Sequence, residues 1–338
     1  MSKTRSISRT ALKKFAITIS VSTALSATLA GSATVMAADY TLSINTALAV
    51  TDPLYKGLEA LQSNIATASG GRLEVKLFPN SQLGPDEDVL EQARAGAPVA
   101  VVVDGGRLAV FQKEFGVLGA PFLASGYDGI RKVVTSDMFE GWVKSLHDGS
   151  SLQVLSFNWW QGERHLLTRK EVNVPADLSG IRMRTPGAPV WTGTIGAMGA
   201  TPTPMPWGEV YSALQSNVID GAEAQFPAIV GAKLDEVITH ITKTGHINLI
   251  TGIVTSAGWF DSLPADLQKI LRDEALKAGD IASYGTRDSL AGIEEQLKAK
   301  GISVRDVDTA PFKDATAKVY DDLGYGDLRD TLRAMAAN

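Results

Sequence analysis

The sequence predicts an α/β protein of two domains, and three observations lead to this prediction. Segments with the two-residue period of strands alternate with segments of helical period from about residue 40 onward. About 300 residues follow an N-terminal targeting segment, which is long for a single hydrophobic core. A helical pattern then runs through residues 265–300, and a helix of that length exceeds what one small domain needs.

Residues 1–37 have the pattern of a secretory signal peptide. Five Lys or Arg residues and no acid precede a mildly apolar stretch over residues 15–29, and small side chains stand at Val35 and Ala37. An uncleaved membrane anchor is the alternative, but serine and threonine interrupt the stretch, whereas a spanning helix needs about 20 mostly apolar residues. We therefore predict cleavage near Ala37 and export from the cytoplasm.

Charge and cysteine content narrow the classes of partner. Removal of the five cations takes the formal net charge from -5 to -10, which disfavours nucleic acid and anionic membranes because both select basic surfaces. The chain has no cysteine, so disulfides, thiolate metal sites and a lipid-modified cysteine after the signal are excluded. We expect an exported protein without a lipid anchor and, in the absence of any assembly signal, a monomer.

The first half of the mature chain alternates strands and helices. Strands are predicted at 40–48 ("YTLSINTAL") and 72–79 ("RLEVKLFP"), and helices at 52–71 and 86–96 ("DEDVLEQARAG"). The run "APVAVVVDGG", residues 97–106, is apolar without alternation, as in a strand of a parallel sheet that is buried on both faces.

A later part of the mature chain repeats this order. "SLQVLSFNWW" (151–160) is predicted as a strand, and "VNVPADLSGIRMRT" (172–185), "WTGTIGAMGA" (191–200) and "PWGEVYSALQSNVIDGAEA" (206–224) as a second set of strand, helix and strand. In the last segment we expect a helix from about Trp207 and then a short strand that ends at Asp220-Gly221. The long helix over 265–300 contains Gly279, Gly285 and Gly292, is closed by Gly301 and is expected to cross both domains.

The sequence contains no recognisable catalytic or metal-binding motif. It lacks the G-x-S-x-G, Walker and His-Glu-x-x-His patterns, and His240 and His246 lie six residues apart instead of on one helical face. "GTIGAMG" (193–199) has G-x-x-G-x-x-G spacing and follows a Pro-Gly-Ala-Pro break, which favours helix packing over a dinucleotide site. We predict no catalysis, no cofactor and no metal.

Three arginines stand among apolar or small neighbours in this acidic chain. Arg182 and Arg184 lie in "GIRMRTPGAPV", and Arg164 lies in "NWWQGERHLLT". The planar guanidinium group matches a carboxylate with two parallel charge-assisted hydrogen bonds. Such arginines either form internal ion pairs or bind an anionic ligand, and the pattern alone leaves both possibilities open.

Several motifs across the mature chain resemble one protein family. They are "SGGRLEVKLFPNSQLG", "FGVLGAPFL", "GERHLLT", "DLSGIRMRTPGAPV", "MGATPTPMPWGEVYSALQSNVIDGAEA" and "LPADLQKIL". In these segments the chain resembles the DctP-type substrate-binding proteins of TRAP transporters, the tripartite ATP-independent periplasmic systems.

The resemblance implies a fold and a domain division. The fold is an α/β periplasmic-binding-protein clamp of two lobes with mixed sheets, hinge strands and a long C-terminal helix that bridges both lobes. We assign 38–161 and 250–289 to lobe I, and 162–249 and 290–338 to lobe II. The implied function is capture of a small carboxylate or sulfonate in the periplasm and its delivery to a small and a large membrane subunit. One alternative is a solute-binding subunit of a sensor or of another transporter class. A less favoured alternative is an exported enzyme that acts on organic acids.

The resemblance also implies site residues. Arg184 matches the family arginine that forms a two-pronged salt bridge to the ligand carboxylate, and Arg164 matches a second family arginine, while alternation places Arg182 on the same strand face as Arg184. Ala224 stands where the family often has a ligand-binding asparagine, so Glu223 or Gln225 is expected to substitute.

Aromatic and strand-end residues complete the predicted site. Trp160 and Trp207 are expected as pocket walls, with the alternative that about half of the tryptophans near these motifs belong to the domain core. Asn45, Thr46 and Asp104-Gly105 lie at the C-terminal ends of predicted strands, at the sheet edge where open α/β sheets bind ligands.

Overall fold

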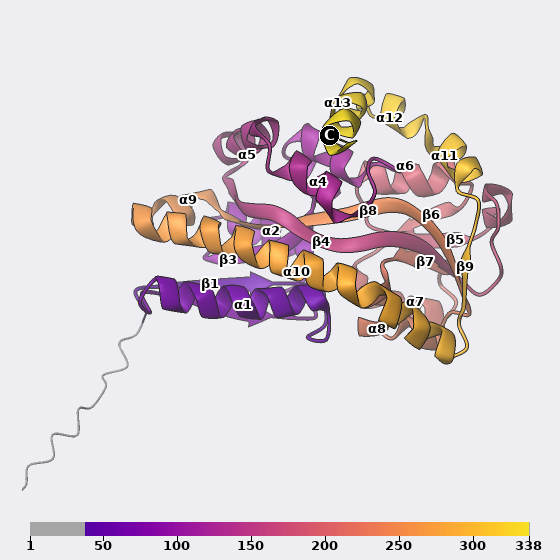
Figure 1. Ribbon diagram of the computed structural model, residues 1–338, viewed down its shortest axis with the longest axis horizontal. Coiled ribbons are helices and arrows are strands. Elements are labelled where there is room, and N and C mark those ends of the chain that lie inside the picture. Colours follow the sequence, from indigo (N-terminus) through magenta and orange to yellow (C-terminus); the bar gives the residue numbers. More distant parts are fainter. Residues whose placement is uncertain (1–37, 338) are drawn as a thin grey trace, which may run out of the picture. The chain divides into compact units, whose positions relative to one another are not determined.

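Two antiparallel strands of 17 residues, β4 (Leu152–Thr168) and β8 (His240–Ser256), form the centre of the sheet in this computed structural model, which describes residues 38–337. The sheet order is β2-β1-β3-β8-β4-β7-β5-β6, and β9 pairs with β8. Strands β1, β2 and β3 therefore lie on one side of the central pair, and β5, β6 and β7 lie on the other (Figure 1). The predicted signal peptide lies outside the described residues.

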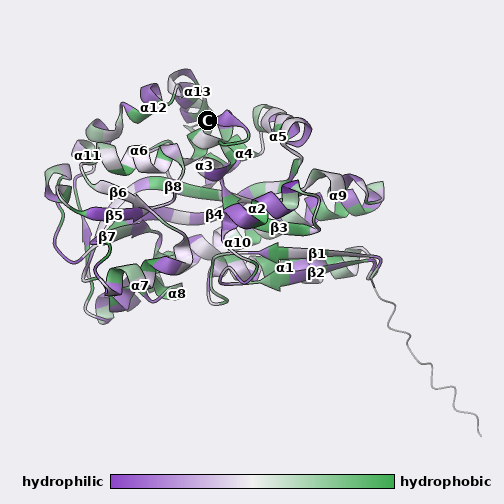
Figure 2. Cartoon of the chain, turned by 180° about the vertical axis from the view of Figure 1, so that it is seen from behind, coloured by the Kyte–Doolittle hydropathy of each residue, from purple (hydrophilic) through white to green (hydrophobic). Residues whose placement is uncertain are grey.

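Parallel and antiparallel pairs both occur in this sheet. Strand β1 (Tyr40–Asn45) runs parallel to β2 (Leu73–Phe78) and β3 (Val99–Asp104), whereas β3 is antiparallel to β8. The other short strands are β5 (Arg182–Thr185), β6 (Thr201–Pro204), β7 (Gly221–Ala224) and β9 (Ser303–Asp306). The predicted mixed α/β architecture is confirmed, and β3 is hydrophobic from Val99 to Val103, before the terminal Asp104 (Figure 2).

Helices cover the sheet in the predicted positions and in several others. The predicted helices appear as α1 (Pro53–Ala68), α2 (Asp86–Arg94), α6 (Pro189–Ala197), α7 (Val210–Gln215) and α10 (Ala265–Ala299). Further helices are α3 (Gly105–Leu108), α4 (Gly126–Val134), α5 (Asp137–Ser150), α8 (Phe226–Gly231), α9 (Ala257–Asp261), α11 (Ala310–Thr316), α12 (Val319–Asp322) and α13 (Gly326–Ala337). Short 3-10 turns cover Lys113–Gly119, Pro175–Leu178, Trp207–Glu209 and Leu234–Glu236. No helix within residues 38–337 is both long and apolar enough to cross a membrane.

Two predicted strands differ from the observed ones. Within 172–185 only Arg182–Thr185 forms a strand, because Pro175 begins a 3-10 turn whose start is capped by the Asp177 carboxylate. The strand expected to end at Asp220-Gly221 instead begins at Gly221, where the backbone approaches Met183 and the Leu167 carbonyl too closely for a larger side chain.

The ladder between β4 and β8 is irregular near its middle. Its register shifts between Val154 and Ser156, between Ser156 and Trp159, and between Trp160 and Gly162. Bulges of this kind bend a strand and increase its local twist. The predicted lobe boundaries at 161/162 and 249/250 fall inside β4 and β8, and residues 38–337 belong to one compact unit, so the division into lobes stays a prediction.

Helix α10 crosses the molecule along β4 and α1, as expected for a bridging helix (Figure 1). Its middle is anchored by polar contacts with β4: the Ser283 hydroxyl donates to the Asn158 carbonyl at 2.8 Å and accepts from the Trp160 amide at 2.8 Å. The Asp280 carboxylate accepts two bonds from Arg131 on α4, at 2.7 and 2.8 Å, and one from the Asn158 amide at 2.8 Å. The helix therefore holds both β4 and α4.

Gly279 lets α10 approach β4 closely at Asn158. A Cβ atom at position 279 would lie 2.4 Å from Asn158 Oδ1, whereas nothing lies within 4 Å of one at Gly285. We expect Gly279→Ala to lower the free energy of unfolding by about 1–3 kcal/mol through overpacking. Gly285→Ala should raise it by about 0.5–1 kcal/mol through helix propensity. Chemical denaturation measures both, and equal effects of the two substitutions would contradict the close approach.

Candidate functional site

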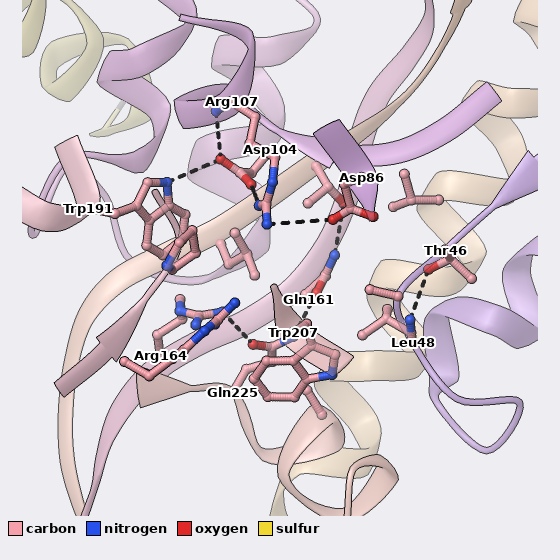
Figure 3. A pocket seen from close by; sticks show the side chains of 17 residues that line it. Thr46, Leu48, Asp86, Asp104, Arg107, Gln161, Arg164, Trp191, Trp207 and Gln225 are labelled. Carbon is pink, nitrogen blue, oxygen red and sulfur yellow. Dashed lines mark hydrogen bonds and ion pairs between the residues drawn. The ribbon is translucent and has the colours of Figure 1, made fainter. Parts of the chain in front are cut away.

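A cavity of about 60 Å³ lies where the carboxyl ends of β1, β3 and β5 face one another (Figure 3). Its lining comes from both sides of the β4–β8 pair: Thr46, Ala47, Leu48, Asp86, Val102, Asp104, Arg107, Gln161, Arg164, Arg184, Pro186, Trp191, Trp207, Gln225, Ala228, Leu249 and Thr251. This is the edge at which open α/β sheets bind ligands.

Arg184 is a buried cation of this cavity without an acidic partner in contact. Its side chain projects from β5 and the residue is 1% exposed. Its Nε and Nη2 atoms donate to the Met205 carbonyl at 3.1 and 2.9 Å, and its guanidinium lies over the Trp207 ring at 5.2 Å. Among the described residues it forms no ion pair within 4 Å.

Burial lowers the pKa of Arg184 to about 9, while the charge of Glu223 acts in the opposite direction. The group therefore stays protonated at neutral pH, and its charge is incompletely balanced. Two hydrogen bonds to a single carbonyl leave guanidinium capacity for an anion, because the group carries five N–H donors.

Arg182 has a different environment, although it is only two residues away. Its Nε and Nη2 atoms bind both oxygens of Asp220, at 2.8 and 2.9 Å, on the exposed end of β5. The hydrogen bond from Arg182 lowers the pKa of Asp220 to about 2. The structure thus separates two arginines that alternation alone could not: Arg184 lines the cavity and Arg182 forms a surface ion pair.

Arg164 lines the cavity but is held by the protein's own groups. Its Nε and Nη2 atoms donate to the side chain and the backbone carbonyl of Glu223, and its Nη1 donates to Gln225 Oε1 at 3.0 Å. Glu223 is fully buried and accepts a further bond from Thr185 Oγ1 at 3.1 Å. Because the charge of Arg164 is balanced internally, the free positive charge of the site belongs to Arg184.

An ordered chain of amides continues from Arg164 across the cavity wall. Gln225 Nε2 donates to Gln161 Oε1 at 2.6 Å, Gln161 Nε2 donates to Thr251 Oγ1 at 3.3 Å, and Thr251 Oγ1 donates to the Trp159 carbonyl at 2.7 Å. Gln225 lines the cavity beside the buried Ala224. Sequence reasoning named Gln225 but missed Gln161, because only the pairing of β4 with β8 brings Gln161 to this wall.

Two carboxylates, Asp86 at the start of α2 and Asp104 at the end of β3, line one part of the cavity wall. Asp104 ends β3, accepts from the Trp191 indole at 3.1 Å and pairs with Arg107. Arg107 also binds Glu87 at 2.8 Å and approaches Asp86 at 3.6 Å. Asp86 Oδ1 is buried and has no hydrogen-bond partner among the described residues. Burial raises the pKa of Asp86 to about 6, and the charge of Arg107 opposes that rise.

Asp86 and Arg107 were missed by the sequence reasoning. The signal for Asp86 was its position at the start of a helix that follows the turn after β2. The signal for Arg107 was its position three residues after Asp104, which ends β3. Asp104 was already predicted to lie at the sheet edge that binds ligands.

The remaining predicted site residues are divided between cavity and core. Trp207 lines the cavity, whereas Trp160 is buried in the core with its indole nitrogen donating to Asn248 Oδ1 at 2.6 Å. Asn45 is fully buried and does not line the cavity; its amide binds the Gly84 carbonyl at 3.2 Å and accepts from the Leu83 amide at 3.1 Å. Trp191 forms the second aromatic wall and stacks on Arg164 at 4.9 Å.

No group of three His, Asp or Glu residues suited to a metal ion occurs in residues 38–337.

Comparison with known proteins identifies the family of this chain. Residues 44–326 match the family of bacterial extracellular solute-binding proteins, family 7, named DctP. The chain belongs to the DctP family of TRAP periplasmic solute-binding proteins. This DctP-family protein is accordingly a binding protein and not an enzyme.

Relatives of this DctP-family protein cover most of its length. It is 28% identical to the sialic acid-binding periplasmic protein SiaP of Vibrio cholerae, over 87% of this chain and 91% of that one. Its fold is similar to an apo open TRAP periplasmic solute-binding protein from Escherichia fergusonii, with 43% identity, a TM-score of 0.77, and coverage of 88% of this chain and 99% of that one. It is also similar to such a protein from Ochrobacterium anthropi with bound L-fuconate, with 31% identity, a TM-score of 0.85, and coverage of 88% and 100%.

The buried Asp86 carboxylate makes the stability of the unliganded protein depend on pH. Its pKa of about 6 lies above the ordinary value of 3.8, so the native state holds its proton more tightly than the unfolded chain does. The contribution of Asp86 to the free energy of unfolding should therefore fall as pH rises from about 4 to 6, and Asp86→Asn should gain about 1–3 kcal/mol relative to wild type over that interval. Urea denaturation measures this difference, with Asp88→Asn on the exposed face of the same helix as the control. A wild-type stability that rises in parallel with that of Asp86→Asn would contradict the assignment.

Proposed function

We propose that this protein captures a small organic anion in the periplasm by holding an acid group of the ligand on Arg184. One observation supports this most directly: Arg184 is buried at the cavity without an acid in contact, whereas Arg164, Arg182 and Arg107 all have carboxylate partners. In a site of low dielectric constant an incompletely balanced guanidinium attracts anions strongly, and its planar fork matches a carboxylate or sulfonate in two-pronged geometry. Arg164, whose charge is balanced by Glu223, then contributes a fixed wall.

The names of relatives agree with an organic acid as ligand. Relatives are named for sialic acid and for C4-dicarboxylate, and solved structures contain L-fuconate and L-galactonate. The chain is more similar in fold to the fuconate-bound structure than to the apo open structure, although it is closer in sequence to the latter. This order is expected of a closed clamp.

The carboxylate side of the cavity narrows the ligand class. Asp86 and Asp104 line the same cavity as Arg184, and Asp86 Oδ1, which has no partner among the described residues, is a hydrogen-bond acceptor. A second carboxylate on the ligand would be repelled there, whereas hydroxyl groups would donate to Asp86. We therefore favour a polyhydroxylated monocarboxylate, such as an aldonate, over a C4-dicarboxylate. Closure of the lobes would trap this acid for delivery to the small and large TRAP membrane subunits by a monomeric binding protein.

Substitution of Arg184 tests the anion clamp. Arg184→Ala should weaken binding of the best organic acid by at least about 100-fold, and Arg184→Lys by at least about tenfold because lysine loses the fork geometry. A thermal-shift screen of organic acids finds the ligand, and calorimetric titration measures the affinities. Arg182→Ala is the matched control, since it removes the same charge two residues away without touching the cavity. Unchanged affinity in Arg184→Ala, with the fold intact by circular dichroism, would refute the clamp.

Substitution of Asp86 tests the ligand class separately. Wild-type protein should bind L-galactonate or L-fuconate at least about tenfold more tightly than succinate, since only the hydroxyl groups satisfy the buried acceptor. Asp86→Asn should weaken aldonate binding and strengthen succinate binding, while Asp88→Asn changes neither. If succinate binds wild type as tightly as any aldonate and Arg184→Ala abolishes both, the anion clamp stands and the preference for polyhydroxylated acids is wrong.

A further inference from the structure

A second hollow, of about 520 Å³, lies at the C-terminal helices and shares no lining residue with the ligand cavity. One wall is the segment Pro121-Phe122, and the others come from α11, α12 and α13. We propose that this hollow is the docking site for an acidic segment of a protein partner. The proposal is independent of which solute the cavity binds.

Three cations surround the hollow, and aromatic rings hold their charges in place. Lys313 Nζ lies 5.6 Å from the centre of the Phe122 ring, and the guanidinium groups of Arg329 and Arg333 lie 5.3 and 5.4 Å from that of Tyr320. Rings at these distances attract a cation through their quadrupole. The rings therefore hold the three charges around one hollow instead of leaving them free on the surface.

Two of these cations have no carboxylate partner. Within residues 38–337, Lys313 and Arg333 form no ion pair within 4 Å, while Arg329 pairs with Asp330 at 2.7 Å. Asp314 is the acid in the lining. Unpaired cations gathered at one hollow form a local site for negative charge in a chain whose formal net charge is -5.

The backbone beneath the hollow is held in an unfavourable conformation. Phe122 has a φ of 54°, in the left-handed region that side chains other than glycine rarely adopt. Its amide donates to the His246 carbonyl at 2.9 Å, and its own carbonyl accepts from Arg333 Nη2 at 3.0 Å. The Tyr320 hydroxyl fixes the preceding carbonyl, that of Pro121, at 2.7 Å. Strain held by such contacts is typical of functional surfaces, and it gives the hollow a rigid wall.

The exposure of the cations favours a protein segment over a free ion. Lys313 and Arg333 are exposed, and an ion pair at an exposed site contributes about 0–1 kcal/mol. A single small anion is therefore bound weakly at this surface. Several carboxylates on one segment engage the three cations together at a high effective concentration, and the acidic remainder of the surface directs that segment to this hollow.

The test is a titration of the isotope-labelled full chain with hexaglutamate at low ionic strength, followed by amide NMR shifts. The amide shifts should be concentrated in the residues around Phe122 and in α11, α12 and α13. The double variant Lys313→Glu/Arg333→Glu should bind hexaglutamate at least about tenfold more weakly, because charge complementarity is lost. Lys144→Glu/Lys269→Glu, at two exposed lysines on α5 and α10, changes the net charge equally and should leave binding unchanged. If the double variant is poorly folded, Lys313→Gln is used in its place. This substitution removes one exposed cation and should give a smaller loss of binding.

The control ligands separate an acidic segment from other ligands. Hexaglutamine should produce no shifts at the hollow, and inorganic phosphate should need at least about tenfold higher concentration than hexaglutamate to produce the same shifts. Phosphate binding as tight as that of hexaglutamate would overturn the proposal in favour of a free-ion site. Shifts spread over the whole surface, or equal binding by the hollow and control double variants, would overturn it as well.

Discussion

The antiparallel pairing of β4 with β8 is the constraint on which the other features of this protein depend. Each strand has 17 residues, far more than the five or six of a typical strand, so different short strands pair with different parts of its length. Strand β3 adds to β8, and β7 adds to β4, so the two halves of the sheet are joined through backbone hydrogen bonds. The shifts of register near Trp159 and Gly162 place bends where the halves meet, and the cavity lies beside these bends.

This pairing gathers charges that are far apart in the sequence. Asp86 and Arg107 belong to α2 and α3, whereas Arg164 and Arg184 belong to β4 and β5. Buried charges are costly unless they are paired, and most of them here are paired: Arg164 with Glu223, and Arg107 with Asp104. Arg184 is the exception. Its two bonds to one carbonyl and its contact with Trp207 stabilise the guanidinium only partly, and this is the basis of the proposed anion site.

Helix α10 and the C-terminal helices attach further elements to the same central pair. Through Ser283 and Asp280, α10 holds β4 and α4 together, and α13 packs on α4. The segment that contains Phe122 is hydrogen-bonded to β8 through His246, so the wall of the second hollow is fixed to the central pair as well. The ligand cavity and the second hollow are therefore distinct surfaces on one scaffold.

The sequence by itself determined the α/β class, the order of most elements, the long helix over 265–300 and the family, because these depend on local periodicity and on motifs that are contiguous in the chain. It also indicated Arg184, Arg164, Trp207 and Gln225 as residues near one site. Only the tertiary structure separated Arg184 from Arg182, since both side chains follow the same alternation and differ in what the neighbouring segments bring to them: Asp220 for one, and the cavity for the other. For the same reason it placed Trp160 in the core, used Asn45 to hold a loop, and brought Asp86, Arg107 and Gln161 to the cavity, because pairing across the sheet has no signature within a single segment.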